Sequence, residues 1–147
     1  MTALVFLFAT SVGCPVMNAA TAGGALGGEV QVTMTRSEKN PGYICQFTRT
    51  GSELTIEIGR LTAPDRFAHF AEIACQGGRD TVPLKAIGNE TIACSMGSNH
   101  QIVEKAVGRV RSQTFVVRFS TMDEAANPKS IRSKNTALAE LVAGNLF

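Results

Sequence analysis

The fold is decided by an alternating stretch near the C-terminus, VEKAVGRVRSQTFVVRFS, at residues 103–120. Apolar and polar side chains alternate on both sides of Ser112-Gln113, so 103–111 and 114–120 are predicted to form an antiparallel hairpin. The side chains predicted to face the core are Phe115, Val117 and Phe119, with Ala106, Gly108 and Val110. The opposite face carries Arg109, Arg111, Val116 and Arg118. The stretch therefore predicts a sheet with one face buried in the core and one face exposed to solvent.

Apolar and polar side chains also alternate in earlier parts of the chain. They alternate over residues 30–35, which predicts a strand that is followed by a turn at Asn40-Pro41-Gly42. Residues 43–48 and 53–58 alternate around Thr50-Gly51-Ser52, which predicts a second hairpin. A short strand is expected at 91–96, after a segment at 76–90 that is mostly loop.

Three helices are predicted between and after these strands. Asn18 can cap a helix that ends at Leu26, and Thr62-Ala63-Pro64-Asp65 can begin one that ends near Cys75. Asn127-Pro128 begins the last helix, which Gly144 ends. Its predicted apolar stripe consists of Ile131, Leu138, Leu141 and Val142. We expect an α+β fold with a single antiparallel sheet of about five to six strands and three helices packed on one face.

Composition and charge limit the organisation and the partners. The chain has 147 residues, of which 44% are hydrophobic and 18% charged, so residues 14–147 are predicted to form a single domain. Its formal net charge of +2 is far from the basic footprint of a nucleic-acid-binding domain, and no nucleic-acid partner is expected. The mean hydropathy of +0.09 argues against disorder.

The first residues resemble an export signal. Residues 3–9, ALVFLFA, form an apolar run that is followed by small residues and then by Cys14. The run is much shorter than the about 20 residues of a membrane-spanning helix, but it suits the hydrophobic segment of a secretory signal. Met1-Thr2 lacks the usual positive charge, so the signal is truncated or the run is a buried first strand or helix. We expect residues 1–13 to be an export segment, no transmembrane span, and a periplasmic or extracellular protein.

Four cysteines lie far apart in the sequence: Cys14, Cys45, Cys75 and Cys94. Zinc ligands normally come in closely spaced pairs, whereas widely separated cysteines in even number favour disulfides in an oxidising compartment. Of the three connectivities we favour Cys14 with Cys45 and Cys75 with Cys94. Each of these pairs would join a segment beside a helix to a strand whose inward face holds the second cysteine. Four reduced, buried thiols are the alternative.

Cys14 has a second candidate fate. A small residue before a cysteine that follows an apolar run is typical of a bacterial lipoprotein signal, in which the cysteine carries the lipid. The preceding residues are Ser11-Val12-Gly13, without the usual leucine. A lipid anchor at Cys14 would also leave an odd thiol. Pairing of Cys14 is therefore preferred to lipidation.

Several segments of the chain resemble small exported bacterial lipoprotein-type domains of unknown function. The similar segments are CPVMNAA at 14–20 with ALG at 25–27, YICQF at 43–47, IGNE at 87–90, GRVR at 108–111, FVV at 115–117 and AGNLF at 143–147. The resemblance implies a bond between Cys14 and Cys45 and a location outside the cytoplasm. It implies no catalytic residue, because the family has no assigned activity.

Residues for catalysis or metal binding are scarce. His69 and His100 are the only histidines, which excludes a metal site with several histidine ligands. Asp65 and His69 are four residues apart on one predicted helix and could tune an imidazole, although a solvated pair is the simpler interpretation. Cys75, six residues after His69, does not share its helix face well enough to predict a thiolate nucleophile. No nucleophile elbow, Walker loop or zinc-protease motif occurs.

Two further patterns also lack the required chemistry. The glycine-rich residues 23–28 precede a strand and include no lysine that could meet a phosphate. Glu53 and Glu57 are about 13 Å apart along one strand face, which exceeds the separation of glycosidase carboxylates. We expect no catalytic residue, no metal and no cofactor.

The outer face of the predicted sheet provides the candidate binding residues. Arg109, Arg111 and Arg118 could hold a carboxylate, a phosphate or an acidic partner surface, although they also suit an ordinary soluble sheet face. The first hypothesis is an exported non-enzymatic domain that binds a small ligand or an envelope protein. A hydrolase-like enzyme using His69 or His100 with a carboxylate is the second. A structural or interaction protein of the cell envelope is the third.

Overall fold

The computed structural model describes residues 13–37, 41–61 and 66–147. Three helices and seven strands follow one another in this part of the chain, in the order α1 (Ala19–Leu26), β1 (Gln31–Ser37), β2 (Gly42–Arg49), β3 (Ser52–Arg60), α2 (Phe67–Ala74), β4 (Arg79–Pro83), β5 (Glu90–Ser95), β6 (Ile102–Val110), β7 (Gln113–Thr121) and α3 (Pro128–Leu146). The apolar run at 3–9 and Asp65 lie outside the described residues.

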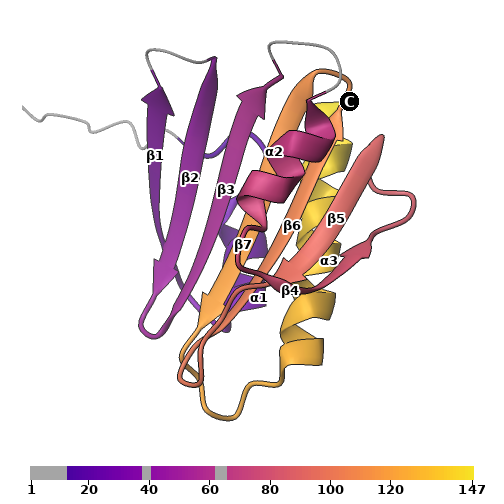
Figure 1. The fold of residues 1–147 in the computed structure, drawn as a ribbon. Coiled ribbons are helices and arrows are strands. Elements are labelled where there is room, and N and C mark those ends of the chain that lie inside the picture. The colour runs from indigo at the N-terminus through magenta and orange to yellow at the C-terminus, as the bar shows by residue number, and fades with distance from the viewer. Residues whose placement is uncertain (1–12, 38–40, 62–65) are drawn as a thin grey trace, which may run out of the picture.

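The strands form one antiparallel sheet in the order β1-β2-β3-β7-β6-β5-β4 (Figure 1). The predicted α+β class and the antiparallel sheet are confirmed, but the sheet has seven strands rather than five to six. The added strand is β4, in a segment predicted to be loop. All five of its residues are exposed and it ends at Pro83. Its sequence therefore lacks the alternation of apolar and polar side chains from which a strand could have been predicted.

The inward side chains of the central strands build the core. Ala106 lies opposite Val117 in the β6–β7 register, so the predicted pairing of the hairpin faces is confirmed. The largest buried apolar side chains of the sheet are Phe47, Leu54, Ile56, Phe115 and Phe119. Leu26 of α1 and Leu138 and Val142 of α3 belong to the same cluster. Helices α1 and α3 therefore cover one face of the sheet.

The helix caps explain where α1 and α3 begin. The Asn18 side chain accepts from the backbone N–H of Thr21, and the Asn127 side chain accepts from that of Lys129, as expected for N-cap residues. The prediction was wrong at the end of α3, which continues through Gly144 to Leu146. Leu141, assigned to the apolar stripe, is 50% exposed, because its place in the repeat puts it at the margin of the helix face that meets the sheet.

Helix α2 lies on the opposite face of the sheet from α1 and α3, which corrects the prediction of three helices on one face. Figure 1 shows α2 in front of the sheet and α3 behind it. Strands β3 and β4 are parallel, because β7, β6 and β5 separate them in antiparallel succession. The β3–α2–β4 connection is thus a crossover, and Figure 1 shows it passing in front of the sheet toward the right as β3 points upward. This is the right-handed sense that such connections adopt.

Two disulfides join the helical segments to the sheet. Cys14 is bonded to Cys45 on β2, and Cys75, directly after α2, is bonded to Cys94 on β5. Both predicted pairs are confirmed, and they indicate an oxidising compartment. The predicted inward position is wrong for Cys94, which lies opposite Lys105 on the outer face of β5, because α2 and Cys75 pack on that face. The sulfur of Cys14 is engaged in its disulfide and is not free to carry a lipid. None of the helices in the described ranges is long and apolar enough to cross a membrane.

Candidate functional site

The three arginines predicted to share a face have different environments. Arg109 lies opposite Thr114 on β7 and Glu90 on β5, and its Nε donates to Glu90 Oε2 at 2.9 Å. Its Nη1 also donates to the carbonyl oxygen of Arg111 at 3.1 Å. Arg109 is therefore on the expected face, but its charge is already paired.

Arg111 is not on the sheet face, which corrects the prediction. Val110 pairs with Gln113, so the hairpin turn consists of Arg111 and Ser112 rather than of Ser112 and Gln113. Arg111 has a φ of 57°, and its backbone N–H donates to Asn89 Oδ1 at 2.6 Å. Tight hairpin turns require positive φ, so this turn geometry takes Arg111 out of the strand alternation.

Arg118 lies on the outer face as predicted, in the β7 register between Thr55 of β3 and Lys105 of β6. Lys105 was not predicted to be part of the site. We call Lys105 and Arg118 the cationic pair. In the ranges that the structure describes, no carboxylate oxygen lies within 4.0 Å of either side chain. Two like charges thus face each other across neighbouring strands, an arrangement that is unfavourable by itself.

Lys105 lies in a partly buried environment at the end of α2. Its Nζ donates to the carbonyl oxygen of Ala74 at 2.9 Å, at the C-terminal end of α2. Burial lowers the pKa of Lys105 from its ordinary value of 10.5, and the charge of Arg118 lowers it further, while Glu57 acts in the opposite direction. The cationic pair therefore lies where α2 stops covering the sheet, in a partly sheltered position that strengthens electrostatic interactions.

Beyond the cationic pair the outer face lacks a covering helix among the described elements (Figure 1). We call this part of the sheet the open face; its outward side chains are Thr33, Thr35, Ile44, Gln46, Thr48, Glu53, Thr55, Glu57 and Arg118. Glu53 Oε1 accepts from Thr55 Oγ1 at 3.0 Å, and Glu57 is exposed. The open face combines a neutral, threonine-rich half on β1 and β2 with an acidic row on β3 beside the cationic pair.

A buried polar cluster under α3 was missed at the level of sequence. Glu104 is only 2% exposed. Its Oε1 accepts from Ser95 Oγ at 2.6 Å and its Oε2 from Arg132 Nε at 3.0 Å. Arg132 Nη2 also donates to Ser95 Oγ at 3.0 Å, and Nη1 to the carbonyl oxygen of Asp80 at 2.7 Å. We call Ser95, Glu104 and Arg132 the polar cluster.

The polar cluster anchors α3 to the sheet. Its three side chains bind one another, and the neighbouring Asn135 Nδ2 donates to the carbonyl oxygens of Glu104 and Val117. One signal could have revealed it: Glu104 has the same parity as Ala106 and Val110, so it is a carboxylate at a core position and must be paired. Its partners on α3 and β5 are distant in sequence, and no pattern names them.

The histidines do not assemble into a site in the described part of the chain. His69 on α2 and His100 in the turn before β6 are both exposed. The described residues contain no group of three or more His, Cys, Asp or Glu side chains that could hold a metal ion. The partner proposed for His69, Asp65, lies outside the described residues, so that pair stays a prediction.

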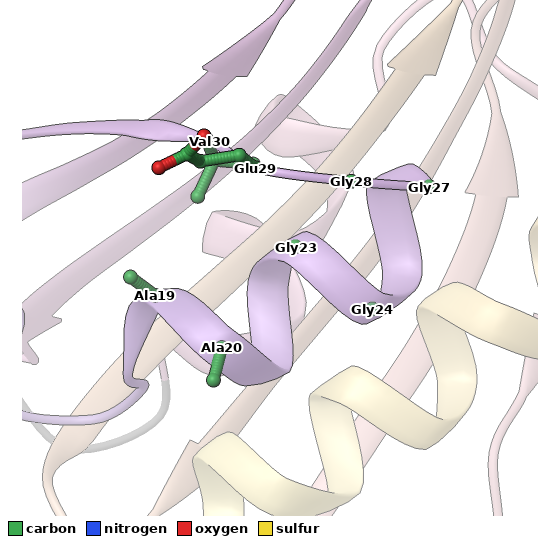
Figure 2. A pocket seen from close by; sticks show the side chains of 8 residues that line it. All are labelled: Ala19, Ala20, Gly23, Gly24, Gly27, Gly28, Glu29 and Val30. Carbon is green, nitrogen blue, oxygen red and sulfur yellow. The ribbon is translucent and has the colours of Figure 1, made fainter.

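Grooves lie beside all three helices; the one between the end of α1 and the start of α3 has a volume of about 310 Å³. Figure 2 shows one of about 510 Å³ beside α1, where the lining side chains other than Glu29 and Val30 are no larger than alanine. A second, of about 500 Å³, lies between α2 and β4–β5 and is lined mainly by apolar residues, among them Phe67, Leu84 and Ile92. Neither of these two grooves is lined by a histidine, a cysteine or a serine. Thr91, Glu72 and Glu90 line the second, but the Thr91 hydroxyl donates to the carbonyl oxygen of Ile87 at 2.7 Å and not to a carboxylate.

The chain matches no protein-family model, no curated protein and no solved structure. The resemblance to exported lipoprotein-type domains therefore stays a prediction.

Proposed function

We propose that this protein is an exported, non-enzymatic binding domain that acts in the periplasm or outside the cell. It holds an acidic ligand or an acidic surface of an envelope partner on the open face. The observation that carries the proposal is the cationic pair, two facing cations without a carboxylate within 4.0 Å among the described residues.

The chemistry of the pair suits a compact anion. The guanidinium of Arg118 presents parallel donors that match a carboxylate or a phosphate, and the ammonium of Lys105 adds a point charge. An anion placed between them would relieve their mutual repulsion. Glu53 and Glu57 on the adjacent strand would repel an extended polyanion, which favours a ligand with one localised negative group.

Several observations support the proposed location outside the cytoplasm and the non-enzymatic role. The two disulfides are typical of proteins in oxidising compartments, and the apolar run before Cys14 favours export. The lipoprotein-type resemblance points in the same direction. The histidines, which a hydrolase-like activity would need, lie on exposed surfaces rather than in the grooves described above.

The test is a titration followed by NMR amide shifts, with inorganic phosphate and a short neutral peptide that carries a single glutamate as separate probes. Lys105→Gln with Arg118→Gln removes the cationic pair. Lys85→Gln with Arg111→Gln removes the same charge from exposed turn positions. We expect wild type and the turn variant to show saturable shifts on β6 and β7 with at least one probe, and the pair variant to lose them. Equal binding by both variants, or no saturable shift in wild type, contradicts the proposal.

A further inference from the structure

The groove between the end of α1 and the start of α3 lies on the face of the sheet that these two helices cover. Its volume of about 310 Å³ is at the small end of the range for ligand pockets. The buried side chains of Phe119 and Ile131 line it, but most of its surface is made of hydroxyl, amide and charged groups. We call it the polar groove. Its size and polarity suit a small polar ligand rather than a segment of a partner protein.

The residues of α3 that line the polar groove share one side of the helix. They are Asn127, Ser130, Ile131 and Lys134, whose spacing of three and four residues makes them neighbours on a helical surface. Ile131 belongs to the core cluster and holds this side against the sheet. The Ser130 hydroxyl and the Lys134 ammonium on the same side are donors that suit a carboxylate. One wall of the groove therefore collects donors for an anionic group.

The sheet adds a pair of hydroxyls to the lining of the polar groove. Ser52 Oγ and Thr121 Oγ1 lie 3.0 Å apart, at paired positions of β3 and β7. Thr121 is only 4% exposed, and its Oγ1 also accepts from the backbone N–H of Asp123 at 3.1 Å. Each hydroxyl has one proton, and the hydrogen bond between the two uses only one of them. Among the described residues no acceptor binds the second proton, so it is available to a ligand.

Asp123 brings the opposite charge to the polar groove. It lies in the connection between β7 and α3, where its Oδ1 accepts from the backbone N–H of Ala125 at 3.0 Å. Neither Asp123 nor Lys134 forms an ion pair within 4.0 Å in the ranges that the structure describes. The groove thus presents one cation and one anion that do not neutralise each other. A ligand with charges of both signs meets both, whereas a ligand with one charge is attracted by one residue and repelled by the other.

We propose that the polar groove binds a small zwitterion of the amino-acid class. The carboxylate of the ligand accepts from Lys134 and Ser130, and also from the hydroxyl of the Ser52–Thr121 pair that has a proton to donate. The ammonium of the ligand donates to Asp123. A few placed polar groups of this kind are what fixes the orientation of a ligand in a pocket. The polar groove and the cationic pair lie on opposite faces of the sheet, so this inference does not depend on the proposed function.

The first test is an NMR titration with L-alanine and with two fragments of it. Propionate is L-alanine without the ammonium, and ethylamine is L-alanine without the carboxylate. We expect L-alanine to cause saturable amide shifts within residues 121–134 and to bind at least about tenfold more tightly than either fragment, because it meets both charges. The proposal is overturned if L-alanine causes no saturable shift there, if its shifts are confined to the surroundings of Lys105 and Arg118, or if propionate or ethylamine binds equally well.

Charge-removing variants assign the two ends of the ligand. Lys134→Gln and Asp123→Asn should each weaken L-alanine binding at least about tenfold. Asp123→Asn should at the same time strengthen propionate binding, because it removes the repulsion of the carboxylate, whereas Lys134→Gln should not. Lys129→Gln and Glu124→Gln are the matched controls, since they remove the same charges from exposed neighbouring positions that do not line the groove. Equal losses in these controls contradict the assigned site. Far-ultraviolet circular dichroism establishes that all four variants are folded.

Discussion

The two lateral ends of the sheet are stabilised by different chemistry. At the β1–β2 end, a disulfide and apolar contacts with α1 hold the strands, and no described strand pairs with the outer side of β1. At the β5–β4 end, the polar cluster of Ser95, Glu104 and Arg132 joins two strands to α3, and its arginine also occupies a carbonyl oxygen of the edge strand. Apolar packing does not require that the backbone groups of the edge strand have partners. A buried ion pair requires defined partners, and here its arginine also binds the carbonyl oxygen of Asp80 on the edge strand β4.

Removing the carboxylate of the polar cluster should have the largest effect. Glu104→Ala leaves Arg132 without its buried counter-charge, which should lower the free energy of unfolding by about 3 to 5 kcal/mol. Replacing both residues, with Glu104→Leu and Arg132→Met, should recover much of that loss. Denaturant unfolding measures both variants, with the exposed Glu57→Ala as a control within about 0.5 kcal/mol. A loss below about 1 kcal/mol for Glu104→Ala would show that the ion pair does not hold this end.

The disulfides allow the two ends to be compared directly. In the chain-entropy model, removing Cys14–Cys45, with a separation of 31, or Cys75–Cys94, with a separation of 19, lowers stability by about 3 to 4 kcal/mol. The longer loop should matter more, by about 0.4 kcal/mol. Paired Cys→Ala variants and their denaturation midpoints test this order. A larger loss from the shorter loop would mean that enthalpic contacts at the β5 end outweigh loop closure.

Backbone strain at the β4 edge predicts a smaller difference. Asp80→Val puts a β-branched residue at a φ of 53° and should lower stability by about 1 to 2 kcal/mol. Thr35→Val on the regular β1 strand should stay within about 0.5 kcal/mol. Asp80→Gly is the control, since glycine accepts this φ. Thermal unfolding of the three variants checks the order, and a loss in Asp80→Gly equal to that in Asp80→Val would assign the effect to the carboxylate instead.

The smallest effect is expected in alkaline solution, where the two ends should respond in opposite directions. The folded state lowers the pKa of Lys105, so it releases that proton before the unfolded chain does, and stability should rise as pH approaches 10.5. Burial raises the pKa of Tyr43 on β2, so the unfolded chain ionises first, and stability should fall as pH rises above 10.0.

Single variants separate the two contributions. Lys105→Gln should remove the rise and Tyr43→Phe should remove the fall, as measured by denaturation midpoints across the alkaline range. A fall that persists in Tyr43→Phe would assign it to another group.

Local signals in the sequence predicted much of the fold. Asn18, Asn127 and Pro128 mark helix starts that the structure confirms. Strand parity placed Cys45 inward and Arg109 and Arg118 outward. The turn of the last hairpin was misplaced by one residue because the alternation fits both positions, and that shift alone moved Arg111 out of the candidate site.

The remaining parts of the site depend on distant contacts. Lys105 is on the correct face by parity, but its importance comes from Arg118 across the strand and from Ala74 at the end of α2. Glu104 could have been suspected from its inward parity. Its partner Arg132 could not, because 28 residues separate them and any polar residue of α3 would have been an equal candidate.

The sequence by itself predicted six of the seven strands, the three helices and the face of most side chains on them, and it favoured the cysteine pairs that the structure has. These properties follow from periods of two and 3.6 residues and from caps that act within a single turn. Only the tertiary structure decided that α2 crosses the sheet on the side opposite α1 and α3, and that β4 and β1 are the outermost strands among the described residues. Those outcomes depend on the spatial order of the strands and on the handedness of a crossover, which no local pattern of side chains contains.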